Sequence, residues 1–259
     1  MRMMKKVLCT VTVLALSVSL LAGCGSTAAS PVSSAASTAA ESTTSSVVSE
    51  TTSAAADENA AAAAQLLNDL TGSYQELWPV ILADEYKQTW LDDCTALVGE
   101  DNAEAAFEKL SSMVTSDVYG EDAVKAYANG GGAYFCGFTN SLATLTFDGE
   151  TSTISGTDKD GNVLFSHTYH YIGMEPVHGL YEFKSDDADS GEFTYFFLAP
   201  DTSAETYHIE FRYGSDAEAL SQYDAGEYAY WVASGISTDC DQTMIDNCIE
   251  LFCTENLAG

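Results

Sequence analysis

Basic residues are scarce in this sequence. Its 259 residues include 9 Lys and Arg against 39 Asp and Glu, which gives a formal net charge of −30 at pH 7. Proteins that bind nucleic acid neutralise its phosphates with clustered Lys and Arg, so we expect no nucleic-acid partner. An acidic surface keeps a protein soluble and attracts cations. Charge alone does not establish metal binding, which has to be argued from particular residues.

Familiar motifs of catalysis are also missing. The chain has no Gly-x-Ser-x-Gly nucleophile elbow, no P-loop and no His-Glu-x-x-His helix. Carboxylates are so frequent that chance pairs are expected, and we assign no glycosidase pair. We therefore expect a protein that is not an enzyme. The alternative, an enzyme acting on cell-wall or host polymers, requires a deep cleft with an acid/base pair of shifted pKa.

The sequence lacks the C-x-x-C spacing of zinc and redox sites. Its cysteines beyond Cys24 are Cys94, Cys136, Cys240, Cys248 and Cys253. An exported protein permits disulfides, but this set is odd in number. The pattern favours buried free thiols, with one bridge as the alternative, and does not support a cysteine nucleophile.

The N-terminus has the pattern of an export signal. Basic residues precede an apolar run from Val7 to Leu21, which is shorter than the ~20 residues that span a bilayer. A charged start, a short apolar core and small residues at its end are typical of secretory signal peptides. The sequence Leu21-Ala22-Gly23-Cys24 resembles the bacterial lipobox, in which the cysteine is acylated. We expect residues 1–23 to be a lipoprotein signal peptide and Cys24 to carry the lipid.

Residues 24–56 differ in composition from the rest of the chain. They are almost entirely Ser, Ala, Thr and Val, without an aromatic residue or a hydrophobic period, and cannot bury enough apolar surface to offset chain entropy. We expect a lipid anchor followed by a disordered stalk. Residues 57–259 are long enough for one globular domain. The expected location is the extracytoplasmic face of a bacterial cell membrane.

Periodicity predicts helices on both sides of a β-rich region. The predicted helices are Asp57–Leu70, Asp84–Leu97, Asn102–Val114, Glu121–Tyr127, Ser215–Tyr223 and Gln242–Thr254. A further helical segment is predicted to start with the capping-box pattern of Ser73–Glu76 and to be limited by Pro79. The predicted strands are Ala133–Thr139, Leu142–Phe147, Ser152–Gly156, Val163–Ile172, Leu180–Lys184, Glu192–Leu198 and Glu205–Tyr213. No helix interrupts these strands, which favours an antiparallel, closed or nearly closed barrel. The expected class is α+β: N-terminal helices, then the barrel, then a C-terminal helix.

The histidines all fall in the β region. His167 and His170 point to opposite sides of their predicted strand and cannot share one ion. His208 and Glu210 lie two residues apart, so their side chains share a face and form a nitrogen/oxygen half-site acceptable to zinc. The alternative is a solvent-facing polar stripe with Glu210 paired to Arg212 or to a neighbouring strand.

Several short stretches, in this order, resemble one family. They are Leu70–Gln75, Leu77–Pro79, Asp158–Gly161, Thr168–Gly173, Gly179–Phe183, Ala199–Pro200 and His208–Gly214. The last resembles the most specific motif, a His-x-His-Phe-Arg-Tyr-Gly strand. Together they are similar to the ZinT family, the lipocalin-like zinc-binding domain also fused to AdcA-type zinc-uptake lipoproteins.

The resemblance implies a lipocalin-like barrel that holds zinc with three histidines near its mouth. His208 matches the first ligand, Glu210 takes the place of the second, and Asp201 is the ligand-capable residue nearest the third. His178, which opens a neighbouring strand, is a further candidate on geometry. The implied function is to scavenge zinc or a similar divalent cation, or to deliver it to a metal ABC transporter. The alternative is a metal-free lipocalin-like module for a small molecule or partner protein, favoured if the His208 face meets bulk solvent.

Overall fold

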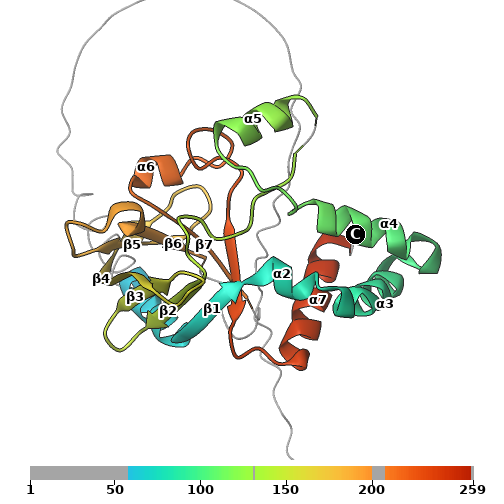
Figure 1. The fold of residues 1–259 in the computed structure, drawn as a ribbon, viewed down its shortest axis with the longest axis horizontal. Coiled ribbons are helices and arrows are strands. Elements are labelled where there is room, and N and C mark those ends of the chain that lie inside the picture. Colours follow the sequence, from blue (N-terminus) through green and yellow to red (C-terminus); the bar gives the residue numbers. More distant parts are fainter. Residues whose placement is uncertain (1–57, 131, 200–207, 258–259) are drawn as a thin grey trace, which may run out of the picture. The chain divides into compact units, whose positions relative to one another are not determined.

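The strands of this protein close into a barrel (Figure 1). The computed structural model describes residues 58–130, 132–199 and 208–257. Within them eight antiparallel strands follow one another in chain order, and the last pairs back with the first. The strands are β1 (Gly72–Glu76), β2 (Thr144–Asp148), β3 (Thr153–Thr157), β4 (Val163–Met174), β5 (Tyr181–Ser185), β6 (Tyr195–Leu198), β7 (Ile209–Gly214) and β8 (Ala233–Ser237). The predicted α+β class with a closed antiparallel barrel is confirmed.

Some of the predicted features belong to residues that the structure does not describe. The signal peptide, the stalk with Cys24, and Asp201 lie outside the described residues. No helix in the described ranges combines the length and apolar character needed to cross a bilayer.

The predicted strands from Leu142 onward overlap β2 to β7. The predicted strand Glu192–Leu198 starts too early, because Glu192 and Phe193 form a 3-10 turn, and residues 205–207 of the predicted strand Glu205–Tyr213 lie outside the described ranges. The predicted strand Ala133–Thr139 is wrong, because this segment forms only isolated bridges at Phe135. Backbone groups of other segments satisfy part of this segment, such as the Tyr230 carbonyl that accepts the N–H of Phe135 at 3.0 Å, and side chains satisfy another part. The Glu76 carboxylate accepts the N–H of Phe138 at 2.6 Å, and the Tyr213 hydroxyl accepts the N–H of Thr139 at 2.6 Å.

The prediction of a helix start at Ser73–Glu76 is also wrong. These residues belong to β1, which pairs with β2 on one side and β8 on the other. The capping-box pattern was outweighed by ladder pairing and by packing of the Tyr74 ring on Phe147, 5.7 Å between centroids. A strand at β8 was not predicted, because its Ala, Ser and Gly residues carry a weak strand signal.

Helices occupy most of the predicted positions, although the predicted helix Ser215–Tyr223 is reduced to four residues. They are a helix over residues 58–69, α2 (Leu77–Ile81), the 3-10 turn Asp84–Tyr86, α3 (Lys87–Val98), α4 (Glu100–Ser112), α5 (Glu121–Ala128), α6 (Ala217–Leu220) and α7 (Gln242–Leu257). A second 3-10 turn, Gly191–Phe193, precedes β6. The helices α3, α4 and α7 contact one another beside the barrel and are called the helical layer below (Figure 1).

Two hydrophobic cores hold these elements. Aromatic side chains fill the barrel; its fully buried members include Phe147, Phe183, Phe196, Phe211 and Tyr213. The core of the helical layer contains Trp90, Cys94 and Ile249 together with Ile236 of β8. Because Ile236 points out of the barrel, the helical layer covers the outer side of the wall at β8.

Candidate functional site

Strand β7 places the predicted ligands at the seam between the barrel wall and the helical layer. Ile209, Phe211 and Tyr213 are buried in the barrel core. Side chains alternate along a strand, so His208 and Glu210 project from the outer side of the wall, at and just before the start of β7. The prediction that His208 and Glu210 project from the same face of their strand is confirmed.

The two side chains lie close together. His208 Nε2 is 3.8 Å from Glu210 Oε1, and their side chains are 11% and 42% exposed. The ring of Phe252 on α7 lies 5.1 Å from the imidazole, and the ring of Trp78 on α2 lies 4.8 Å from Phe252. The imidazole is therefore shielded by aromatic residues, while the carboxylate reaches solvent. The predicted solvent-facing stripe is not observed, since Arg212 is fully buried.

His178 has different neighbours. Its Nδ1 lies 3.6 Å from Glu175 Oε2, and its ring packs on Tyr223 with 3.7 Å between centroids. Across the described ranges, no three His, Cys, Asp or Glu side chains form a group that could hold a metal ion. The structure thus brings His208 and Glu210 together, and within the described ranges His178 does not join them in a group that could hold a metal ion.

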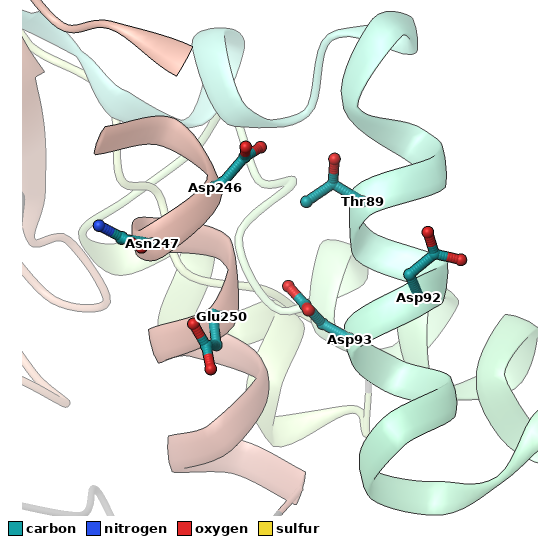
Figure 2. Close-up of a pocket in the computed structure, with 6 residues that line it drawn as sticks. All are labelled: Thr89, Asp92, Asp93, Asp246, Asn247 and Glu250. Carbon is teal, nitrogen blue, oxygen red and sulfur yellow. The ribbon is translucent and has the colours of Figure 1, made fainter. Parts of the chain in front are cut away.

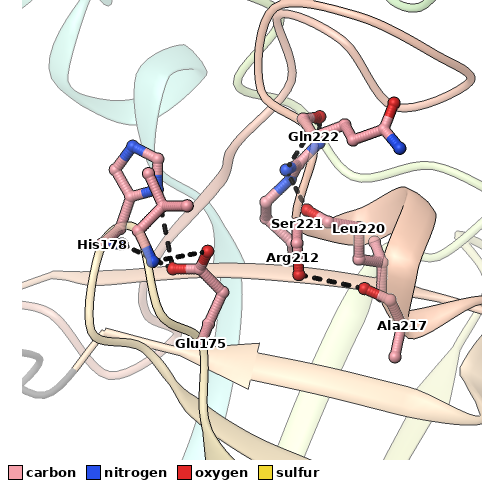
Figure 3. A network of polar contacts seen from close by, with 8 residues as sticks. Glu175, His178, Arg212, Ala217, Leu220, Ser221 and Gln222 are labelled. Carbon is pink, nitrogen blue, oxygen red and sulfur yellow. Dashed lines mark hydrogen bonds and ion pairs between the residues drawn. The ribbon is translucent and has the colours of Figure 1, made fainter. Parts of the chain in front are cut away.

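A buried polar network that the sequence reasoning missed lies on the same outer side of the wall (Figure 3). The Glu175 carboxylate is fully buried and accepts the backbone N–H groups of Val177 at 3.0 Å and His178 at 2.6 Å. These bonds hold the turn between β4 and β5. A Glu followed closely by Pro, Val and His carries no sequence signal for such burial.

Arg212 is the second centre of this network. Its guanidinium donates to the carbonyls of Leu220, Gln222 and Tyr228 and lies 4.1 Å over the Tyr223 ring. Burial lowers the pKa of Arg212 from its ordinary value. The contacts fix the segment after α6 against β7, next to Glu210.

The remaining histidines bind carboxylates. His167 Nδ1 is 2.7 Å from Asp187 Oδ2, and His170 Nδ1 is 2.6 Å from Asp186 Oδ1. The prediction that they project from opposite faces agrees with their burial, since His167 is half-buried and His170 is exposed. Each forms a local pair at the β4–β5 side of the barrel.

An acidic hollow of about 270 Å³ opens between α3 and α7 (Figure 2). It is lined by Thr89, Asp92, Asp93, Asp246, Asn247 and Glu250. Burial, and then the carboxylates of Glu250, Asp246 and Asp92, raise the pKa of Asp93. Neither His208 nor Glu210 lines this hollow.

The fold and the site together define a closed antiparallel barrel with a His/carboxylate pair on the outer side of one strand. Among solved structures, the Zn(II)-bound ZinT-like domain of Streptococcus pneumoniae AdcA is similar, with 16% identity and a TM-score of 0.45 over 71% of this chain and 89% of that domain. Zn(II)-bound AdcA from Streptococcus pneumoniae matches with 15% identity and a TM-score of 0.41 over 74% of this chain and 35% of its own. No family model matches the chain, and no curated protein matches it significantly.

Proposed function

We propose that this protein binds a divalent metal ion, zinc above all, at the extracytoplasmic face of a bacterial membrane. A lipid on Cys24 anchors it there, and the bound ion is scavenged or passed to a metal ABC transporter. One observation carries the proposal: His208 Nε2 and Glu210 Oε1 lie 3.8 Å apart on one strand. The same strand has the strongest sequence resemblance to ZinT.

The chemistry of these donors suits zinc. Zn²⁺ accepts imidazole nitrogen and carboxylate oxygen at about 2.0–2.2 Å in a four-coordinate shell. The His208 imidazole and the Glu210 carboxylate would supply two of the four ligands. Softer metals are matched less well by a carboxylate. Asp201 remains the ligand predicted from the sequence for a third position, with water as the fourth.

Zinc titration calorimetry on the detergent-solubilised full-length protein tests the proposal. We expect one saturable site that His208→Ala removes and Glu210→Ala weakens at least tenfold. His170→Ala is the matched control, because this exposed histidine lies on β4 and is paired to Asp186, which follows β5. A wild type without saturable binding, or a His208→Ala variant that binds as the wild type does, contradicts the proposal.

A second candidate function is binding of an apolar group without metal. An open groove of about 400 Å³ runs beside α2, lined by residues that include Trp78, Pro79, Leu82 and Phe135. Because aromatic side chains fill the barrel, this groove is a better place for an apolar ligand than the barrel interior. Binding of a hydrophobic fluorescent probe that quenches Trp78 and is insensitive to chelators would favour it.

A further inference from the structure

Two cysteines of the helical layer face each other. Cys94 on α3 and Cys253 on α7 are both completely buried, and their Sγ atoms lie 3.8 Å apart. Among the described cysteines, no other pair lies within sulfur hydrogen-bonding distance. Cys248, on the same helix as Cys253, is equally buried. Cys248 and Cys253 therefore share a position on α7 and complete burial. Of these two residues, only Cys253 lies next to another sulfur atom.

We propose that Cys94 and Cys253 form a disulfide in the exported protein. A disulfide needs its sulfur atoms at about 2.05 Å, so the thiols must approach by rotation of their side chains and a small adjustment of the helices. The helices α3 and α7 already contact each other and share one core. The bond therefore fits the packing that the fold provides, and an export signal directs the chain to a compartment where such bonds persist.

The oxidation is a thiol–disulfide exchange with a protein or small-molecule disulfide. One cysteine thiolate attacks that disulfide and releases one of its sulfurs as a thiol, leaving a mixed disulfide. The second cysteine thiolate then attacks the protein sulfur and releases the other thiol. The two cysteines lose two protons and two electrons, and the reacting disulfide is reduced to two thiols.

The timing of this reaction follows from burial. Both sulfur atoms are inaccessible in the folded protein, and burial raises the pKa of each thiol, which disfavours the reactive thiolate. The exchange therefore takes place while the chain folds, before α7 closes on α3. After docking, the same burial protects the bond from reductants.

The bond would link two distant parts of the chain. Cys94 and Cys253 are separated by 159 positions, and the loop between them contains β2 to β8. Closing so long a loop restricts the unfolded chain strongly. Cys253 also follows Phe252, whose ring packs on His208, so the bond holds the helix that shields the proposed ligand.

Peptide mapping tests the proposal. Full-length protein is recovered from the cell envelope without reductant, its free thiols are alkylated, and a non-reduced digest is analysed by mass spectrometry. We expect one peptide pair joined through Cys94 and Cys253, absent from Cys94→Ser and retained in the matched control Cys248→Ser. Reduction should lower the thermal midpoint of the wild type by roughly 5–15 °C and leave that of Cys94→Ser unchanged.

The mapping of the wild type decides the question even if a variant fails to fold. Recovery of Cys94 and Cys253 both alkylated without prior reduction overturns the proposal, as does a bridge from either residue to another cysteine. The assay contains no zinc. A linked peptide in a protein that binds no zinc would therefore contradict the proposed metal function alone.

Discussion

The ring of Phe252 lies against the imidazole of His208, with 5.1 Å between their centroids. The contact joins α7 to the residue immediately before β7. An imidazole held between a strand and an aromatic side chain loses rotational freedom before any ligand arrives, and such preorganisation favours binding. The helical layer thus supports the proposed site as well as the fold.

Removal of this ring should weaken zinc binding. For Phe252→Ala we expect about tenfold lower zinc affinity, since residues that orient a metal ligand typically contribute 10–100-fold. The free energy of unfolding should fall by about 2–4 kcal/mol. Phe252→Leu, which keeps an apolar side chain against His208, should retain most of the affinity. Calorimetry and urea denaturation of both variants check this, and an unchanged affinity in Phe252→Ala would show that the ring does not position the imidazole.

Arg212 should be one of the most sensitive positions for stability. Its guanidinium donates to the buried carbonyls of Leu220 and Tyr228 and to the partly buried carbonyl of Gln222, and Lys presents no planar fork to reach all of them. Arg212→Lys should lower the free energy of unfolding by about 2–4 kcal/mol, because unpaired buried acceptors cost about 1–3 kcal/mol each. Lys125→Ala is the control: its ion pair with Asp122 is exposed to solvent, so its removal should change the free energy of unfolding little. Equal losses in urea denaturation would contradict the role assigned to Arg212.

The β-rich half of the fold was predictable because its signal is local. Strands β2 to β7 are mostly rich in β-branched and aromatic residues, and turn residues separate most of them. Several of them also alternate apolar and polar residues, and this period placed His208 and Glu210 on one face. β1 and β8 could not be recognised in this way. Residues 72–76 fit a helix cap as well as a strand, and β8 consists mainly of small residues; each is defined by pairing with the other.

The surroundings of the site depend on contacts between distant residues. Phe252 reaches His208, and Arg212 reaches the carbonyl of Tyr228, because barrel closure and docking of α7 bring these segments together. A hydrophobic period shows that Phe252 is on the apolar face of its helix. It does not show which residue that face meets.

Gly149 should tolerate no side chain. A Cβ there would lie 2.4 Å from Asn68 Cα and 2.6 Å from Leu67 O, both backbone atoms of the first helical segment. Gly149→Ala should therefore push the helix over residues 58–69 away from the β2–β3 turn and destabilise the protein by several kcal/mol. Gly173→Ala, where the nearest atom is the Glu182 carboxylate at 3.9 Å, is the control. Similar thermal midpoints for the two variants would sink this account.

The anchor can be tested separately from the metal site. If Cys24 is the acylated residue, cells fed a clickable palmitate analogue should label the wild type, and the protein should sediment with membranes. Cys24→Ala should lose both the label and the membrane association, because it has no thiol to acylate at this position and so carries no lipid anchor there. The Cys248→Ser variant, altered in the globular domain, should keep both. Labelled Cys24→Ala protein would place the lipid elsewhere.

Titration of Asp93 in the acidic hollow should make the free energy of unfolding depend on pH. Its pKa is raised in the folded protein, mainly by burial and then by Glu250, Asp246 and Asp92. Between the ordinary value of 3.8 and the raised value, the folded state binds more protons than the unfolded state. The free energy of unfolding therefore falls as the pH rises through this window, and it stays reduced above it.

Asp93→Asn removes this charge and should be more stable than the wild type at pH 7, with the advantage disappearing as the pH falls below 3.8. Asp92→Asn is the matched control, because Asp92 is exposed and already accepts a hydrogen bond from Gln88; its gain should be smaller. Thermal midpoints of the three proteins between pH 3 and pH 8 give the measurement. An Asp93→Asn advantage that persists at pH 3 would mean that packing, and not the repelled carboxylate, controls stability in this hollow.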